Sequence, residues 1–176
     1  MKVIQKRQLY NAISMIPGII MVLILGPKNK YPKKIAIYGY IITCIGSIIY
    51  HLHASVKEEE YINWKFLRLD LFCQQAGIYI GMLCSQMGIQ GVLTIIPLTI
   101  CSMITNLNYS NERIISFISN SICIIIACLF APKVYKYFII AGLIFIYSQI
   151  KKHTYIGTVF HFMIHICMYT YYESLS

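Results

Sequence analysis

The chain has 176 residues, of which 58% are apolar and 12% are charged. A soluble domain of this length carries about 25% charged residues, so the composition excludes an ordinary water-soluble fold. The net charge is +9, but the basic residues lie between apolar runs instead of forming one basic patch, which argues against nucleic-acid binding. We therefore expect an integral membrane protein whose lysines contact anionic lipid headgroups.

Seven apolar stretches approach the length of about 20 residues that a helix needs to cross the hydrocarbon core. In chain order they cover 9–26, 35–55, 66–87, 89–106, 113–131, 134–150 and 155–172. Polar residues separate most of them, at 27–34, 57–60, 106–113, 131–133 and 151–153, whereas the third and fourth stretches meet near 86–90 with little separation. The sequence thus predicts an all-α fold in which residues 1–176 form a single domain, a bundle of seven transmembrane helices.

The first apolar stretch lacks the arrangement of a cleavable signal peptide, so we expect it to remain as a helix. If the N-terminus is inside, nine basic residues share its side of the membrane and six lie opposite. The nine are Lys2, Lys6, Arg7, Lys57, Lys65, Arg68, Arg113, Lys151 and Lys152, and the six are Lys28, Lys30, Lys33, Lys34, Lys133 and Lys136. The excess on the N-terminal side favours a cytosolic N-terminus.

The cysteines indicate neither a disulfide framework nor a zinc finger, because their number is odd and no CxxC pair is present. Nearly all of them lie in apolar stretches, where small packing residues are expected. They are Cys44, Cys73, Cys84, Cys101, Cys123, Cys128 and Cys167.

Few strongly polar side chains fall inside the predicted helices, and each needs an explanation because polar groups are costly in hydrocarbon. Asp70 is the only aspartate in the chain and lies early in the third helix. His51 lies late in the second helix, and His161 and His165 lie in the first half of the seventh. In an up-and-down bundle these segments reach the same membrane face, that of the N-terminus. The sequence therefore predicts that the four side chains converge there.

Two spacings of four residues place side chains one helical turn apart. Ser47 and His51 share a face of the second helix, and His161 and His165 share a face of the seventh. An i, i+4 histidine pair can bind one metal ion because both imidazoles project from one stripe. Three imidazoles and a water molecule form a coordination set of catalytic zinc, which leaves one position open for chemistry. We therefore predict Zn²⁺ on the three histidines, with Asp70 accepting a proton and Ser47 donating a hydrogen bond to a developing oxyanion.

A simpler interpretation assigns each intramembrane histidine to an interhelical hydrogen bond and nothing more. The combination of Ser47, His51, Asp70, His161 and His165 at one depth favours the metal site. The same pattern resembles the superfamily of membrane hydrolases that includes alkaline ceramidases. Its other members are the progestin and adiponectin receptors, the bacterial haemolysin-III proteins and the myomaker-like proteins.

This resemblance implies zinc on His51, His161 and His165, with Ser47 and Asp70 beside the zinc-bound water. It also implies a lipid amide as substrate, ceramide or a related membrane lipid, cleaved by a zinc-dependent hydrolase. One alternative is a receptor or membrane-remodelling protein in which zinc only ties helices together. Another is a small metal transporter, although the chain shows no repeated halves of the kind such proteins carry.

Overall fold

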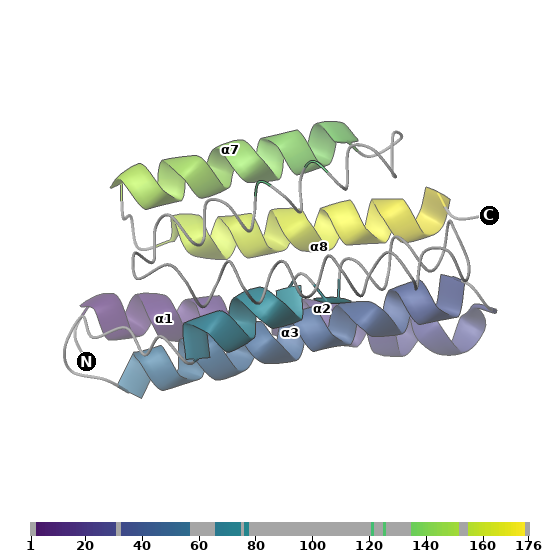
Figure 1. Cartoon of the computed structure of the whole chain (residues 1–176), viewed down its shortest axis with the longest axis horizontal. Coiled ribbons are helices and arrows are strands. Elements are labelled where there is room, and N and C mark those ends of the chain that lie inside the picture. The colour runs from purple at the N-terminus through teal and green to yellow at the C-terminus, as the bar shows by residue number, and fades with distance from the viewer. Residues whose placement is uncertain are drawn as a thin grey trace.

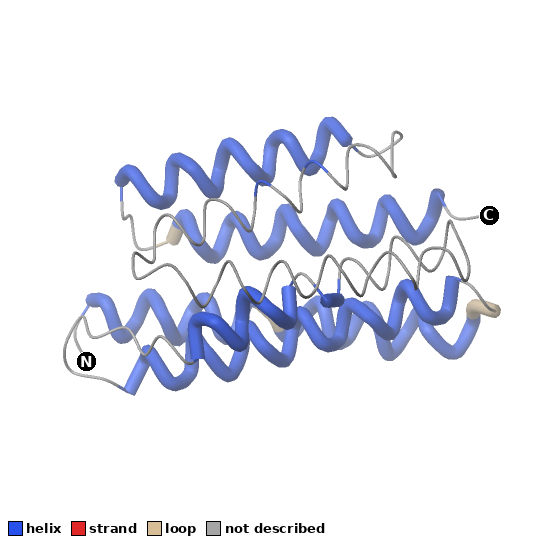
Figure 2. Tube along the Cα trace, in the orientation of Figure 1, coloured by secondary structure: helices blue, strands red, loops and turns tan. Residues whose placement is uncertain are grey.

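The structure of the chain, a computed structural model, describes residues 3–30, 33–56, 66–74, 76–77, 121, 125, 135–151 and 155–174. Nearly all of these residues are helical, and none of them forms a strand (Figure 2). The all-α prediction is thus confirmed for this part of the chain. The predicted helices at 89–106 and 113–131 and the end of 66–87 lie outside the described residues, apart from single helical positions at Ser121 and Ile125.

The first apolar stretch forms two helices, α1 (Val3–Ser14) and α2 (Ile16–Leu25), where the sequence predicted one helix over 9–26. The interruption at Met15 has a chemical cause in Pro17, which has no backbone N–H and cannot bond to the carbonyl four residues earlier. The chain instead makes two tighter bonds of 3.2 Å, from Met15 N to Ala12 O and from Gly18 N to Met15 O. In a regular helix the Gly18 N–H would bond to the Ser14 carbonyl, so the interruption leaves that carbonyl available to another partner.

The other described helices match the predicted boundaries to within two residues. A short 3₁₀ turn, η1 (Gly26–Lys28), follows α2. Helix α3 covers Lys33–Val56, α7 covers Tyr135–Lys151 and α8 covers Ile156–Ser174. Residues 66–74 are also helical. Two helical stretches of the described residues are long and apolar enough to cross a membrane: Gln5–Lys28, which includes α2, η1 and most of α1, and Lys33–Val56, which is α3.

The helices run side by side, with α1 and α2 packed on α3, α8 packed on α1 and α3, and α7 packed on α8 (Figure 1). The N-terminus lies at the end of the molecule where α3 finishes and α8 starts, and the C-terminus lies at the opposite end (Figure 1). This arrangement brings the last turns of α3 and the first turns of α8 to the level of α1.

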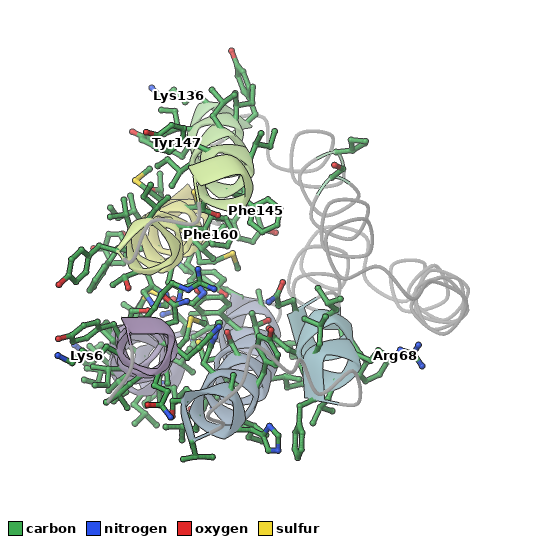
Figure 3. All side chains as sticks on the ribbon, turned by 90° about the vertical axis from the view of Figure 1, so that its left-hand side faces the viewer. Lys6, Arg68, Lys136, Phe145, Tyr147 and Phe160 are labelled. Atoms are coloured by element: carbon green, nitrogen blue, oxygen red, sulfur yellow. The ribbon has the colours of Figure 1, made fainter. Side chains whose placement is uncertain are left out.

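The main core lies where α2, α3, α7 and α8 meet. Its fully buried side chains include Val22, Ile37, Tyr40, Cys44, Cys167, Met168, Tyr171 and Tyr172. Phe145 and Phe160 meet between α7 and α8 with ring centres 5.3 Å apart, whereas Lys6, Arg68 and Lys136 point outward (Figure 3).

Large aliphatic side chains cover much of the outer surface, and several polar side chains are buried inside. Leu23 is 58% exposed and Leu143 is 61% exposed, and isoleucines are exposed along α2 and α3. The buried polar side chains are Asn11, Ser14, Thr43, Ser47, His51, Asp70, His161 and His165. An aliphatic outer surface around buried polar side chains suits helices whose outer face contacts lipid.

Candidate functional site

His51 on α3 and His161 on α8 face each other in the interior. Their ring centres are 5.2 Å apart, and both side chains are buried. A tetrahedral metal ion that binds two imidazole nitrogens at about 2.0–2.1 Å holds the ring centres roughly 5 Å apart. The spacing of this pair therefore suits joint coordination of one ion.

The hydrogen bond to His51 comes from the first helix. His51 Nδ1 lies 2.6 Å from Gln8 Oε1. Because an amide oxygen can only accept, the proton is on Nδ1 and the lone pair is on Nε2. No hydrogen bond reaches that Nε2 from any residue that the structure describes.

His161 is oriented in the same way, again by α1. Its Nδ1 lies 2.7 Å from Ser14 Oγ and 3.2 Å from the Asn11 carbonyl oxygen. Ser14 Oγ donates its own hydrogen to the same Asn11 carbonyl at 2.7 Å, so it accepts from the histidine. His161 therefore also carries its proton on Nδ1. Within the described ranges its Nε2 has no hydrogen-bonding partner.

His165 differs, because both of its nitrogens are engaged. Its Nε2 donates to the Ser14 carbonyl at 2.7 Å, the carbonyl that the interruption at Met15 leaves available. Its Nδ1 accepts from the Tyr40 hydroxyl at 2.7 Å, and the two rings meet edge to face. His165 thus joins α8 to the α1–α2 junction and to α3 by direct hydrogen bonds.

Ser47 on α3 lies next to Asp70 of the helical segment 66–74. The Ser47 hydroxyl is a neighbour of the Asp70 carboxyl group, and both side chains are buried. Ser47 Oγ and Asp70 Oδ1 nevertheless make no hydrogen bond of standard geometry. Gly46 permits this approach, since a Cβ there would collide with the Cys73 side chain and would lie 3.6 Å from the Asp70 Cα.

Two buried oxygens without partners are costly in an apolar interior, where such groups are normally satisfied. Exceptions of this kind occur at functional sites and call for a chemical role. A carboxylate oxygen can accept a proton, and a hydroxyl can donate a hydrogen bond. The role that the sequence assigned to this pair, proton acceptance by Asp70 and hydrogen-bond donation by Ser47, stays a prediction.

The structure thus places the five predicted site residues as two pairs and one neighbour. His51 meets His161, Ser47 meets Asp70, and His165 lies one turn from His161 with its nitrogens engaged elsewhere. Within the described part of the chain, no three His, Cys, Asp or Glu side chains are grouped to hold one metal ion. His53, two residues after His51 on α3, stacks on Phe66 with ring centres 4.2 Å apart.

Sequence reasoning missed Gln8, Asn11, Ser14 and Tyr40, which supply the hydrogen bonds to the histidines. The first three carried a detectable signal, because polar residues three apart lie along one side of an apolar helix. Tyr40 carried none, since tyrosine is common in apolar helices and near the membrane surface. No family model, curated protein or solved structure matches this chain.

Proposed function

We propose that this chain is a multi-pass membrane protein of seven helices that hydrolyses a lipid amide with the help of a zinc ion. Two apolar helical stretches with aliphatic outer faces and a few buried polar side chains support the membrane assignment. The excess of basic residues on one side orients the N-terminus to the cytosol. Residues 66–87, 89–106, 113–131, 134–150 and 155–172 supply the remaining helices of the bundle.

The facing pair of His51 and His161 carries the metal proposal. Each ring donates Nδ1–H to an oxygen and keeps a lone pair on Nε2, which is the usual state of a metal-binding histidine. His165 is the third predicted ligand and would have to exchange its Tyr40 hydrogen bond to present Nδ1. Two of the three residues therefore suit the group as they stand, whereas His165 is not grouped with them among the described residues and is held by Tyr40 and the Ser14 carbonyl.

Zinc bound there would supply a Lewis acid for the lipid carbonyl and a more acidic water molecule. The protein's own part lies with Asp70 and Ser47. Asp70 Oδ1, buried and without a hydrogen bond, can accept a proton during attack and return it to the leaving nitrogen. Ser47 Oγ–H can donate to the oxygen on which negative charge develops.

The test combines metal content with activity in detergent-purified protein. We expect about one zinc per chain in the wild type, lost in the His161→Ala, His165→Ala double variant. Against ceramide and related lipid amides, Asp70→Asn should retain zinc and lose activity by on the order of 100-fold, the size of a general-base contribution. A well-folded wild type prepared without chelators that binds no zinc would exclude this hydrolase.

A second candidate is a receptor or membrane-remodelling protein in which the histidines serve only to join helices. The hydrogen bonds of His165 favour it, because they connect α1, α3 and α8 with no metal ion. The two candidates differ at Asp70 and Ser47. In the second, both residues can be replaced without loss of function, whereas the histidines cannot.

A further inference from the structure

The side chains that face His51 and His161 from α1 have no part in the chemistry described above. Gln8, Asn11 and Ser14 recur at intervals of three along one side of this helix, and Asn11 and Ser14 are buried. Each provides an oxygen to a histidine on another helix. These hydrogen bonds indicate why α1 carries polar residues along this side.

We propose that α1 is the positioning element of the metal site: Gln8 and the Ser14–Asn11 pair hold His51 and His161 as Nδ1–H tautomers, so that both Nε2 lone pairs point to one divalent transition-metal ion. This inference rests on the proposed function, because the ion is the one assigned there. Gln8, Asn11 and Ser14 are positioning residues and touch neither metal nor substrate.

The argument starts from what an oxygen partner dictates. A neutral imidazole has one N–H and one lone pair, and a carbonyl or amide oxygen accepts only from the N–H. Gln8 Oε1 at 2.6 Å and the Asn11 carbonyl at 3.2 Å therefore both select the Nδ1–H form. Two independent oxygens thus leave the lone pair on the same nitrogen, Nε2, of two histidines whose ring centres are 5.2 Å apart.

His165 provides an internal contrast in the same structure. Its oxygen partner, the Ser14 carbonyl, meets Nε2 and not Nδ1, so it selects the opposite tautomer. Helix α1 therefore contacts the i, i+4 histidines through different groups. The Ser14 side chain contacts His161, and the Ser14 backbone carbonyl contacts His165. Packing alone would not require the same tautomer on both histidines of the facing pair.

The tautomers can be read directly from ¹⁵N chemical shifts of histidine-labelled protein in detergent micelles, without metal. In the wild type we expect Nδ1–H at His51 and His161 and Nε2–H at His165. In Gln8→Ala, His51 should lose its single tautomer while His161 keeps its own. In Ser14→Ala, His165 should keep its tautomer, because its partner is the Ser14 backbone carbonyl, and any change should be confined to His161, where the Asn11 carbonyl remains.

Zinc titration of the same samples supplies the second readout. Gln8→Ala should weaken zinc binding about 10–100-fold, the usual effect of losing an outer hydrogen bond. Gln8→Glu restores an acceptor and should return the affinity to within a few-fold of the wild type. Ser14→Ala should weaken binding less than Gln8→Ala, since the Asn11 carbonyl remains at 3.2 Å. Asn29→Ala, which removes an amide bonded within its own segment to Leu25, should leave both readouts unchanged.

An Nε2–H tautomer at His51 or His161 in the wild type would overturn the positioning role without any variant. Equal zinc affinity in the wild type and Gln8→Ala would overturn it while leaving the hydrolase proposal intact. Wild-type protein with the expected tautomers but no zinc binding would instead remove the hydrolase proposal, and with it the metal that α1 is proposed to serve.

Discussion

His161 and His165 lie one turn apart on α8, on the same face, yet the structure gives their rings different surroundings. Among the described residues His161 bonds through Nδ1 and faces His51, whereas His165 bonds through both nitrogens to the α1 backbone and to Tyr40 of α3. The difference arises from the neighbours and not from α8 itself. Next to His161, α1 offers the Ser14 hydroxyl and the Asn11 carbonyl, whereas next to His165 it offers the Ser14 carbonyl that the interruption at Met15 leaves available.

This contrast shows that a spacing pattern can bring two histidines to one site without giving them one role. The HxxxH spacing accounts for a shared face, since residues four apart lie above one another on a helix. Whether each ring offers a lone pair depends on which oxygens surround it. We therefore expect His161 to be committed to metal binding and His165 to combine that role with holding helices together.

The largest expected effects separate the two histidines directly. His51→Ala and His161→Ala should each weaken zinc binding by more than the roughly 10–100-fold that loss of an outer hydrogen bond costs, because each removes a ligand. His165→Ala should affect zinc less and stability more, since it removes two interhelical hydrogen bonds. Isothermal titration and thermal unfolding of the three variants provide the comparison. Equal losses of zinc binding in all three would show that the rings share one role.

Gly18 allows a second test, because α2 approaches His165 there without a side chain. A Cβ at this position would lie 2.6 Å from His165 Cε1 and 2.8 Å from Cys44 Sγ, so one of them must move. We expect Gly18→Ala to destabilise the bundle by about 1–3 kcal/mol, as overpacking of a tight core does. Zinc binding through His51 and His161 should persist.

Gly26→Ala is the matched control on the neighbouring turn η1. Its Cβ would meet only the far end of the Tyr38 ring, at 2.7–3.0 Å, and that side chain is partly exposed and can move. The control should lower the unfolding temperature less than Gly18→Ala. If the two variants have the same unfolding temperature, the close contact of Gly18 with His165 and Cys44 adds nothing to stability beyond ordinary packing.

Tyr40→Phe addresses the exchange that His165 needs before it can bind metal. The change removes the donor at 2.7 Å from Nδ1 and leaves the ring in place. Interhelical hydrogen bonds in membrane proteins contribute about 0.6 kcal/mol on average and at most roughly 1.7, so stability should fall by that order. Zinc affinity should rise several-fold, because the lone pair no longer has to give up a partner.

Unchanged zinc affinity in Tyr40→Phe would mean that His165 stays outside the metal site. Competition with a chromophoric chelator measures the affinity, and urea or heat unfolding measures stability. Tyr38→Phe, at a partly exposed ring on the same helix, controls for loss of a hydroxyl. It should leave the zinc affinity as it is.

The sequence predicted those parts of the fold and site that follow from hydrophobic length and helical spacing. The boundaries of α3, α7 and α8 follow from apolar stretches between charged ones, because the cost of placing charge in hydrocarbon is large and local. The meeting of His51 and His161 follows from helix direction, since alternate helices return side chains to the same end. These are consequences of single segments and of simple up-and-down order.

The features that the sequence did not predict are the interruption between α1 and α2 and the hydrogen-bond partners of the histidines. Pro17 lay within a predicted helix, and its effect on the Ser14 carbonyl becomes visible only once α8 lies opposite. Likewise, nothing in the spacing of Tyr40 and His165, 125 residues apart, distinguishes this tyrosine from the others of α3. The hydrogen-bond partners of a buried histidine are set by packing of separate helices, which a single sequence leaves open.

The smallest expected effect concerns a polar contact at the level of His161 that involves no histidine. Thr158 Oγ1 donates to Asn11 Oδ1 at 3.1 Å and so joins α8 to α1. Thr158→Val should cost about 0.6 kcal/mol, the average for one such bond, and should change zinc affinity less than twofold. Thr170→Val is its control on the same helix, because Thr170 bonds only to the Ile166 carbonyl of α8.

Thermal unfolding and zinc titration of this threonine pair decide how selective the α1 contacts are. If Thr158→Val leaves zinc affinity intact, general loosening of α1 against α8 does not disturb the metal site, and the effects of Gln8→Ala must act through the His51 ring. If it weakens zinc binding as much as Gln8→Ala does, the contrast between the histidines reduces to helix packing, since any loss of contact between α1 and α8 would then have the same result.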